Sequence, residues 1–418
     1  MNKKILVIGG NQLNGKIINQ TSKNATLPII AGAILTDKKV YLENIPNLLD
    51  IDNMLKIMED LGVKIEKNKK SYILDSSSVN KFVIDASLSK NLRYSIFMLG
   101  PMLARFKKVS VSYPGGCDIG IRPIDLHISG LKQLGVKIKE HHSILICDGS
   151  NMKAGEVHLD FASVGATENL MMSAIFLNGT TKIINSAKEP EIVDLQNFLN
   201  KIGCKISGAG TSEIIVEGVK KLKSVSYCPI GDRIVAGSYL IATAMCGGDI
   251  IIKNTPSNQL TSLTKKLEQA GCELFIKKDS IRLISTGKLK AVPSTETQIY
   301  PGFPTDLQAQ FMAMQTVSNG VSTIVETIFE NRYRHAGELI KMGANIRLYD
   351  RVAIINGVEN LNGAPVEATD LRGGASLVLA GLKAKGYTTI DNIYHIERGY
   401  EDIVKTLSHL GANIKYIE

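Results

Sequence analysis

The sequence contains no tryptophan, only 6% aromatic residues and no long uninterrupted run of apolar residues. The longest apolar run, from Ala236 to Gly248, is interrupted by Ser238 and Thr243 and stays below the ~18 residues that cross a bilayer. In MNKKILVIGGNQ at the start, the apolar stretch ends at Asn11, short of the ~7–15 residues in the hydrophobic region of a signal peptide. We therefore expect neither a transmembrane segment nor a secretion signal, and predict a cytoplasmic protein.

Closely spaced cysteines are also missing. The six cysteines lie at least 18 residues apart, so the sequence has no C-x-x-C pair and no zinc-ligand spacing, and we expect reduced thiols. The pair His141 and His142 has no third ligand nearby in the sequence, which favours an exposed turn over a metal site. The sequence thus predicts no metal and no cofactor.

The basic residues show no concentration typical of a nucleic-acid-binding surface. There are 49 Lys and Arg against 40 Asp and Glu, a net charge of +9, but they are scattered and the aromatic residues do not form the pattern of an RNA-recognition module. We expect no nucleic-acid partner and no membrane partner, and the positive surplus suits a small anionic ligand better. A length of 418 residues with 44% hydrophobic residues predicts two or three domains, each with its own core.

One sequence pattern occurs six times. In each copy an amphipathic stretch ends in an apolar residue and a glycine, and a short strand of alternating residues follows. A glycine just after the last apolar position supplies the left-handed residue that ends a helix. These glycines recur every 68–73 residues. The copies are MEDLGVKIE, LKQLGVKIK, LNKIGCKIS, LEQAGCELF, IKMGANIRL and LSHLGANIK, with Gly62, Gly135, Gly203, Gly271, Gly343 and Gly411.

Each copy also has a second, more apolar segment upstream, such as NATLPIIAGAIL or ATENLMMSAIFL. Helices that are apolar on all sides are buried helices. A strand follows each of these segments, so the repeated unit is helix, strand, loop, amphipathic helix, strand and hairpin strand. Six such units predict an α/β (α+β) fold built around buried helices.

The ends of the chain decide how the six units are grouped. Counted from Ser22, five units fit before residue 369, and the sixth is too short to be complete. The first 21 residues contain the strand KILVIGG, which would complete it. We predict two three-unit domains, 22–230 with the loop of Cys117, and 231–418 plus 1–21. Clefts between domains are favoured ligand sites, so we expect the active site between them.

The segment from Gly10 to Lys16 imitates a phosphate-binding P-loop that follows a strand. Ile17 replaces the Ser or Thr that would hold magnesium, and no helix pattern follows. A hairpin turn is the expected structure.

Charged and polar residues stand at the starts of the apolar helices and in the loops before the amphipathic ones. Cations beside helix N-termini build anion sites, although capping and surface ion pairs place similar residues there. Cys117 follows two glycines in SYPGGCDIGIRPID, with Arg122 nearby, a setting in which a thiol titrates low and reacts. These observations point to a small, multiply anionic ligand and a reactive thiol.

The motifs SKNATLPI, PGGCDIGIRPIDLH, SVGATEN, EPEIVD, FPTDLQAQF, FENRYRH, ATDLR and HIERGYE occur in this order. They resemble, over essentially the whole chain, the motifs of UDP-N-acetylglucosamine 1-carboxyvinyltransferases, a family of enolpyruvyl transferases. The resemblance implies two domains of three repeated units around buried helices, an inside-out α/β barrel. It also implies transfer of the enolpyruvyl group of phosphoenolpyruvate to the 3′-hydroxyl of UDP-N-acetylglucosamine, with release of phosphate by addition and elimination. That reaction is the first committed step of peptidoglycan synthesis, and its partners are the two small substrates.

The resemblance implies a role for each matching residue. Cys117 would be the general acid, would form an adduct with phosphoenolpyruvate and would be alkylated by the antibiotic fosfomycin. Asp306 would accept the hydroxyl proton, and Asn24 and Asp370 would orient the ligands. Phosphoenolpyruvate would be held by Lys23, Asn24, Arg122, Arg332, Arg372 and Arg398. UDP-N-acetylglucosamine would be bound by Arg93, Arg122, Pro123, Ile124, Asp125, Leu126, Ser163, Val164, Gly165, Asp306 and Ile328.

The sequence departs from the family at one position and leaves alternatives. Phe161 stands where some members have Lys, so we expect packing or backbone contacts on the uridine side in place of a charged one. His395 is either a site residue or a structural histidine. One alternative acceptor is shikimate 3-phosphate, against which PGGC and Asn24 argue. Another alternative is a non-catalytic paralogue that binds the nucleotide sugar, against which the retained catalytic motifs argue.

Overall fold

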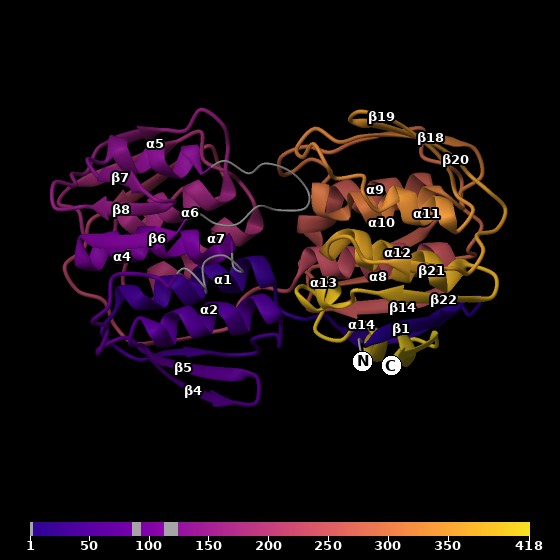
Figure 1. Cartoon of the computed structure of the whole chain (residues 1–418), viewed down its shortest axis with the longest axis horizontal. Coiled ribbons are helices and arrows are strands. Elements are labelled where there is room, and N and C mark those ends of the chain that lie inside the picture. The colour runs from indigo at the N-terminus through magenta and orange to yellow at the C-terminus, as the bar shows by residue number, and fades with distance from the viewer. Residues whose placement is uncertain (1–2, 86–92, 113–123) are drawn as a thin grey trace. The chain divides into compact units, whose positions relative to one another are not determined.

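The computed structural model of the chain describes residues 3–85, 93–112 and 124–418 (Figure 1). These residues form two compact units. The N-terminal unit comprises the described residues from 21 to 230, and the C-terminal unit comprises residues 3–20 together with 231–418. Each unit has a separate hydrophobic core, as expected when a chain of this length divides.

Three apolar helices form the centre of the N-terminal unit. They are α1 (Lys23–Gly32), α4 (Leu99–Phe106) and α6 (Val164–Ser173), and on α1 every residue except Asn24 is buried. Serines begin two of them, because Ser22 Oγ accepts from Ala25 N and Ser163 Oγ from Ala166 N. Short 3₁₀ turns, η1 (Ala33–Leu35) and η2 (Arg93–Met98), flank α1 and α4. The amphipathic helices are α2 (Leu49–Asp60), α5 (Asp125–Gln133) and α7 (Pro190–Lys201).

Three sheets complete the N-terminal unit, and each contains one hairpin. The first has the order β13 (Val225–Tyr227), β3 (Val40–Leu42), β5 (Ser71–Asp75), β4 (Lys64–Asn68). The second is β6 (Lys108–Ser112), β8 (Ile144–Asp148), β7 (Lys137–His141). The third is β11 (Lys205–Ser207), β12 (Glu213–Glu217), β10 (Thr180–Ile184), β9 (Glu156–His158). His141 and His142 lie at the exposed turn between β7 and β8, as the sequence predicts.

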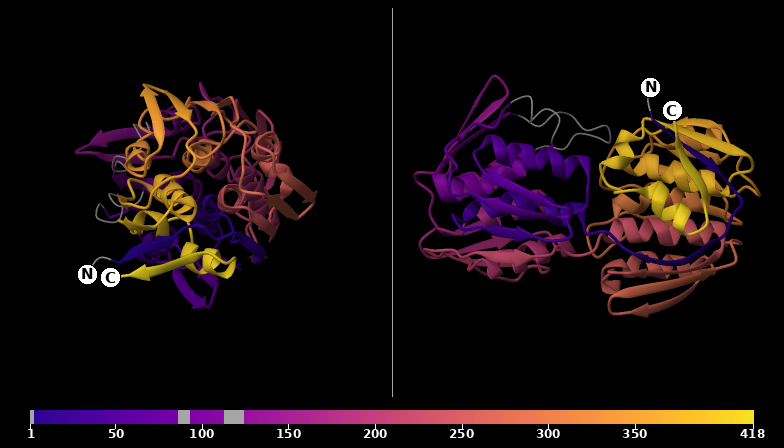
Figure 2. Two further views of the ribbon diagram at one scale, coloured as in Figure 1. Left: turned by 90° about the vertical axis from the view of Figure 1, so that its right-hand side faces the viewer. Right: turned by 90° about the horizontal axis from the view of Figure 1, so that it is seen from below.

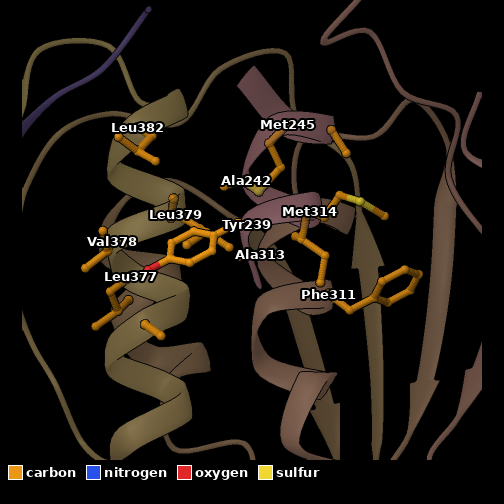
Figure 3. Packing of buried hydrophobic residues seen from close by; sticks show 14 of the residues in the cluster. Tyr239, Ala242, Met245, Phe311, Ala313, Met314, Leu377, Val378, Leu379 and Leu382 are labelled. Atoms are coloured by element: carbon orange, nitrogen blue, oxygen red, sulfur yellow. The ribbon is translucent and has the colours of Figure 1, made fainter. Parts of the chain in front are cut away.

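The C-terminal unit repeats this plan around α8 (Arg233–Cys246), α10 (Gln308–Gln315) and α12 (Leu371–Lys383). Side chains of the three helices belong to one hydrophobic core, and Figure 3 shows Tyr239 of α8, Phe311 of α10 and Leu377 of α12 among them. The outer helices are α9 (Thr261–Gln269), α11 (Ala336–Lys341) and α14 (Ile403–His409). The shorter turns are η3 (Ser257–Leu260), η4 (Thr305–Leu307) and α13 (Tyr394–Glu397).

The sheets of the C-terminal unit use both ends of the chain. The first is β15 (Glu273–Lys277), β16 (Ser280–Ser285), β14 (Gly248–Lys253), β2 (Leu13–Ile18). The second is β17 (Ser294–Glu296), β18 (Val321–Val325), β20 (Val352–Asn356), β19 (Asn345–Tyr349). The third is β21 (Pro365–Glu367), β22 (Tyr387–Asp391), β1 (Lys4–Ile8), β23 (Asn413–Ile417), which brings the two termini side by side (Figure 2).

The expected hairpin turn between Gly10 and Lys16 is wrong. β1 pairs with β22 and β23, whereas β2 runs parallel to β14 from Leu13 opposite Gly248 to Ile18 opposite Lys253. The two strands therefore belong to different sheets. The polar, glycine-containing segment between them is a crossing from one sheet to the next, a structure that composition does not distinguish from a turn.

The repeated glycines end the amphipathic helices as predicted. Gly62, Gly135, Gly203, Gly271, Gly343 and Gly411 all have φ between 91° and 109°, a region that side chains other than glycine rarely adopt. The predicted α/β class, with repeated units around buried helices, is confirmed. The sheets are separate, so the described strands form no closed barrel. No helix in the described parts of the chain is long and apolar enough to cross a membrane.

Candidate active site

A carboxylate and two arginines meet at the start of the buried helices of the C-terminal unit. Asp306 lies in η4, directly before α10, Arg332 precedes α11, and Arg372 is in the first turn of α12. Arg332 Nη2 donates to Asp306 Oδ1 and Arg372 Nη2 donates to Asp306 Oδ2, each at 2.8 Å. The two arginine side chains are only 2% and 4% exposed, whereas that of Asp306 is 27% exposed. Both cations are therefore held against one carboxylate that faces solvent on its open side.

Asp370 fixes the first turn of α12. Its Oδ1 accepts from the backbone N–H groups of Arg372 and Gly373, each at 3.0 Å, which makes it the N-cap of the helix. Burial acts to raise the pKa of Asp370, but the charge of Arg332 and these N–H groups lower it below its ordinary value. Asp370 is thus an ionised residue that sets the position from which Arg372 extends.

Some donors of the two arginines remain available. Among the described residues, Arg332 Nε and Arg372 Nη1 are buried and have no hydrogen-bond partner. Buried polar groups normally have partners, so two such groups beside a carboxylate mark a place where an acceptor can bind. The chemistry of this donor set fits an anionic group such as a carboxylate or phosphate.

Arg398 and His395 lie on or next to α13, which packs against α12. His395 is 8% exposed, and its ring lies 4.0 Å, centroid to centroid, from the ring of Tyr394. Arg398 follows the last residue of α13 and is partly exposed. Ile328 belongs to the loop after β18, where its backbone N–H donates to Glu326 Oε1 at 2.9 Å.

Lys23 opens α1 in the N-terminal unit and forms a buried ion pair that the sequence analysis did not anticipate. Its Nζ lies 3.0 Å from Asp50 Oδ2, and the two side chains are 4% and 2% exposed. Asp50 is an acidic residue in the first turn of α2, a position that usually signals only a favourable helix start. Asn24, the next residue, is the one partly exposed position of α1.

Two groups of predicted nucleotide-sugar contacts lie together in the N-terminal unit. Ile124 directly precedes α5, whose first turn carries Asp125 and Leu126, and Ser163 to Gly165 begin α6. The ring of His127 packs against Gly165, since a Cβ atom added at Gly165 would lie 3.1 Å from His127 Cε1. Phe161, at the same end of α6, is 54% exposed.

Asn169 joins these helix starts and was missed by the sequence analysis. Its amide nitrogen donates to Ile96 O at 3.0 Å and lies 2.8 Å from His127 Nδ1, and its oxygen accepts from Gly100 N at 2.7 Å. Ile96 belongs to η2, the turn that Arg93 begins, so one fully buried amide connects η2, α4 and α5 to α6. Its position in SVGATEN was visible in the sequence, but its partners were not.

Glu168, the residue before Asn169, is a buried carboxyl group whose desolvation is not offset by hydrogen bonds from the described residues. It is fully buried, and neither of its oxygens has a hydrogen-bond partner among the described residues. Burial, followed by the charges of Glu191 and Glu189 at the start of α7, raises the pKa of Glu168 well above its ordinary value. Glu168 is therefore a neutral acid in the core. The remaining predicted residues Cys117, Arg122 and Pro123 lie outside the described residues.

Comparisons with known protein sequences give a consistent family. The sequence profile of EPSP synthase (3-phosphoshikimate 1-carboxyvinyltransferase) matches residues 7–407. A relative from Caldanaerobacter subterraneus, UDP-N-acetylglucosamine 1-carboxyvinyltransferase 2, is 46% identical over 411 residues, which cover 98% of this chain and 99% of the relative. UDP-N-acetylglucosamine 1-carboxyvinyltransferase from Yersinia pestis is 46% identical over 99% of both chains.

Solved structures with the same fold are more distant in sequence. The enolpyruvyl transferase NikO from Streptomyces tendae has a TM-score of 0.88 with 22% identity over 99% of both chains. An EPSP synthase from Acinetobacter baumannii has a TM-score of 0.78 with 16% identity over 100% of both chains. At these identities the structures establish the shared fold.

Proposed function

The chain belongs to the EPSP synthase family of enolpyruvyl transferases, and we propose that it transfers the enolpyruvyl group of phosphoenolpyruvate to the 3′-hydroxyl of UDP-N-acetylglucosamine. The observation that carries this proposal is the 46% identity with UDP-N-acetylglucosamine 1-carboxyvinyltransferases over nearly the full length of both chains. The likeness to EPSP synthases, at 16–17% identity, extends to the fold. UDP-N-acetylglucosamine is therefore favoured over shikimate 3-phosphate as the acceptor.

The reaction proceeds by addition and then elimination. In the addition, the methylene carbon of phosphoenolpyruvate gains a proton while the sugar oxygen bonds to C2 and loses its own proton. In the elimination, the new methyl group loses a proton and the C–O bond to phosphate breaks, which releases phosphate and leaves the enol ether. The protein must supply a base for the hydroxyl, an acid for the carbon and cations for the phosphate and carboxylate.

Asp306 is the proposed base. Each of its oxygens accepts a hydrogen bond from an arginine, which fixes the plane of the carboxylate. A carboxylate has about four lone-pair positions, so Asp306 retains capacity to accept a bond from the sugar hydroxyl. The exposed side of Asp306 is where a ligand reaches it, because Arg332 and Arg372 cover the other side.

The arginines that hold Asp306 are also the proposed anion contacts. Arg332 Nε and Arg372 Nη1 are buried donors that a carboxylate or phosphate oxygen of phosphoenolpyruvate would satisfy. The family resemblance adds Lys23, Asn24, Arg122 and Arg398 to this set, and Asp370 supports Arg372 through the α12 N-terminus.

Two further assignments rest on the resemblance. Cys117 is proposed as the general acid and as the residue that forms an adduct with phosphoenolpyruvate and reacts with fosfomycin. The nucleotide sugar is proposed to contact the start of α6, the residues around the start of α5, Arg93, Ile328 and Asp306. The closeness of the α5 and α6 N-termini supports a common binding surface in the N-terminal unit.

We place the activity in the cytoplasm, in peptidoglycan synthesis, and hence in the maintenance of cell shape and in division. The five cysteines of the described residues are all free thiols, as is usual in a reducing compartment.

Product analysis by mass spectrometry tests the proposal. The protein is mixed with phosphoenolpyruvate and either UDP-N-acetylglucosamine or shikimate 3-phosphate. We expect the enolpyruvyl ether of the nucleotide sugar together with phosphate, and no product from the shikimate compound. If only shikimate 3-phosphate gives a product, the acceptor is shikimate 3-phosphate and the proposed acceptor is wrong. Product from neither acceptor, with binding of the nucleotide sugar intact, would favour a non-catalytic paralogue.

The same assay tests Cys117. Cys117→Ala should abolish turnover, whereas Cys117→Asp should retain some, because a carboxylic acid can still donate a proton. Fosfomycin should add its mass to the wild-type protein and leave Cys117→Asp unmodified. Full turnover by Cys117→Ala would remove the general-acid assignment.

A further inference from the structure

Glu326 follows β18 and is a fully buried carboxylate with a complete set of hydrogen-bond donors. Its Oε1 accepts from Thr297 Oγ1 at 3.0 Å and from the backbone N–H groups of Ile328 and Phe329 at 2.9 and 3.2 Å. Its Oε2 accepts from Thr305 Oγ1 at 2.9 Å. One carboxylate thus connects three segments of the C-terminal unit.

The segments that Glu326 connects carry the proposed chemistry. Thr305 begins η4 and directly precedes Asp306, the proposed base. Ile328 is a proposed nucleotide-sugar contact, and the same loop continues to Arg332. Arg332 Nη2 returns to η4, where it donates to the carbonyl of Thr305 at 3.2 Å as well as to Asp306. The loop and η4 are therefore held together at two places, by Glu326 and by Arg332.

The stability of the fold alone does not explain why a carboxylate is buried at Glu326. Burying a carboxylate is costly, and apolar groups of similar volume often stabilise a protein at least as well as a buried charge does. The four donors to Glu326 are hydroxyl and backbone N–H groups at fixed directions, so they satisfy it only when the segments keep one relative position. A buried group of this kind specifies geometry, and misplacement of a reacting group by about 1 Å can cost about 100-fold in rate.

We propose that Glu326 is a positioning residue, which acts through the hydroxyl of Thr305 to hold Asp306 at the correct distance from the nucleotide-sugar contact at Ile328. This inference rests on the proposed function, because the distance matters only if Asp306 accepts the proton of the sugar hydroxyl. It assigns Glu326 and Thr305 no contact with the substrate.

The link between Glu326 and η4 can be cut without removing Glu326. Thr305→Val keeps the shape of the side chain and deletes the hydroxyl, and it leaves the three bonds to Glu326 Oε1 in place. Thr305→Ser restores the hydroxyl and loses only a methyl group. Thr323→Val, on β18 with no side-chain bond to Glu326, is the matched control for the Thr-to-Val change.

Steady-state kinetics with phosphoenolpyruvate and UDP-N-acetylglucosamine, and titration calorimetry with the nucleotide sugar, test the proposal. We expect kcat of Thr305→Val to fall by about 10- to 100-fold, with Kd for the nucleotide sugar within about threefold of the wild type. Thr305→Ser should recover most of kcat, and Thr323→Val should match the wild type. Thermal unfolding checks that all variants are folded.

Three outcomes overturn the proposal. They are a kcat of Thr305→Val within twofold of the wild type, an equal loss in Thr305→Ser, and a loss of nucleotide-sugar affinity that accounts for the whole effect. If Thr305→Val does not fold, Thr305→Ala replaces it. That variant also deletes the hydroxyl that donates to Glu326 Oε2 and leaves the three bonds to Oε1 in place, so a wild-type kcat in it is equally decisive. An inactive wild-type protein refutes the proposed function, whereas an active wild type with unaffected variants refutes the positioning role alone.

Discussion

The two units share a plan of three buried helices but treat buried acidic groups differently. In the C-terminal unit, Asp306 meets two arginines, Asp370 meets backbone N–H groups and the charge of Arg332, and Glu326 meets four donors. In the N-terminal unit, Glu168 meets no donor among the described residues, and burial raises the pKa of Asp194 to about 6. Asp194 accepts from the hydroxyl of Tyr227 and from the backbone N–H of Ile230, but burial outweighs these two bonds, whereas Asp50 pairs with Lys23.

The difference shows that the repeated scaffold does not dictate the electrostatics of its core. A buried carboxylate whose donors and cations offset the cost of burial stays ionised and can hold cations or accept a proton, whereas burial raises the pKa of one whose donors are too few. In the C-terminal unit, Asp306 is therefore held by two arginines in the ionised form that a proton acceptor requires. In the N-terminal unit burial raises the pKa of both Glu168 and Asp194, and the charges of Glu191 and Glu189 at the start of α7 raise that of Glu168 further.

The largest expected difference between the units concerns their dependence on residues 1–21. β1 is the inner strand between β22 and β23, and its Ile5 and Val7 are in the core, so residues 231–418 alone lack an inner strand. We predict that this fragment is aggregated or molten, whereas residues 22–230 alone unfold cooperatively in urea. Joining residues 1–21 after Glu418 through a Gly/Ser linker should restore cooperative unfolding, as followed by circular dichroism. Equal stability of 231–418 with and without residues 1–21 would show that our division at 21/22 is not a folding boundary.

The opposite pH dependence of the two units is the next largest effect. The pKa of Asp194 rises from 3.8 to about 6 on folding and that of Glu168 rises too, so their contribution to stability is present at low pH and is lost as pH rises through those folded values. For Asp194 alone the loss is about 3 kcal/mol, since one pKa unit is about 1.4 kcal/mol. Asp370 has a lowered pKa, so its contribution is present above 3.8 and is lost as pH falls.

Hydrogen exchange followed by mass spectrometry measures each unit separately in the intact chain. After correction for intrinsic exchange, peptides of α7 should lose protection as pH rises from about 4 to about 6, the interval between the ordinary pKa of Asp194 and its folded value. Peptides of α12 should lose protection only as pH falls below 3.8, the ordinary value, toward the lowered pKa of Asp370. A parallel pH response in both units would contradict the assignment of neutral acids to one of them.

The repeat pattern was sufficient to predict much of the fold but not these partners. The helix ends and the buried helices could be predicted from local sequence. A glycine after the last apolar position indicates a helix end, and a helix that is apolar on all sides is buried. Charged residues at helix starts, such as Asp370, were also recognisable, because capping is local. Asp50, Asn169 and Glu326 form hydrogen bonds to Lys23, Ile96 and Thr305, which lie 27, 73 and 21 residues away in the sequence. These contacts exist only when the elements have packed together, and no local pattern encodes them.

The path of β2 shows the same limit in the backbone. Its sequence, with Gly15 among polar residues, predicts a turn, but in the structure it forms a strand that pairs with β14. Similarly, Glu168 looks like an ordinary helical glutamate in SVGATEN, and only the packing of α6 reveals that it is fully buried. The predicted contacts that depend on Cys117 and Arg122 stay predictions.

Replacing one carboxyl group in each unit by an amide sharpens the comparison. Asp306→Asn removes the carboxylate to which both buried guanidinium groups donate, so we expect a loss of about 2–3 kcal/mol in the free energy of unfolding, together with a steep fall in turnover. The Kd for the nucleotide sugar should stay within about tenfold of the wild-type value, or ~1.4 kcal/mol.

Glu168→Gln removes a group that is costly to ionise, so at pH 8 the N-terminal unit of this variant should be as stable as that of the wild type or more stable.

Urea unfolding at pH 8 of both variants, with saturation kinetics of Asp306→Asn, gives the measurement. Unchanged turnover of Asp306→Asn with weakened binding would make Asp306 a ligand contact only. A destabilisation of Glu168→Gln as large as that of Asp306→Asn would show that Glu168 is ionised and compensated in the folded protein.

The smallest predicted effect compares two buried tyrosines of nearly equal exposure, Tyr227 at 6% and Tyr333 at 7%. The hydroxyl of Tyr227 donates to the carboxyl group of Asp194 at 2.6 Å, whereas that of Tyr333 donates to the carbonyls of Ile324 and Arg351 at 2.8 and 3.1 Å. Hydrogen bonds to charged groups contribute about 1.5–3 kcal/mol and neutral ones about 0.5–1.5 kcal/mol. Only the acceptor of Tyr227 changes charge, because the pKa of Asp194 is about 6.

Tyr227→Phe should therefore cost about 1.5 kcal/mol at pH 8, where Asp194 is ionised, and less than about 1 kcal/mol at pH 5, where it is protonated. Tyr333→Phe should cost the same at both pH values, since its acceptors do not titrate. Urea unfolding of the two variants and the wild type at each pH measures the four differences. An equal cost of Tyr227→Phe at pH 5 and pH 8 would mean that Asp194 does not change protonation in this interval, and the contrast between the units would then rest on Glu168 alone.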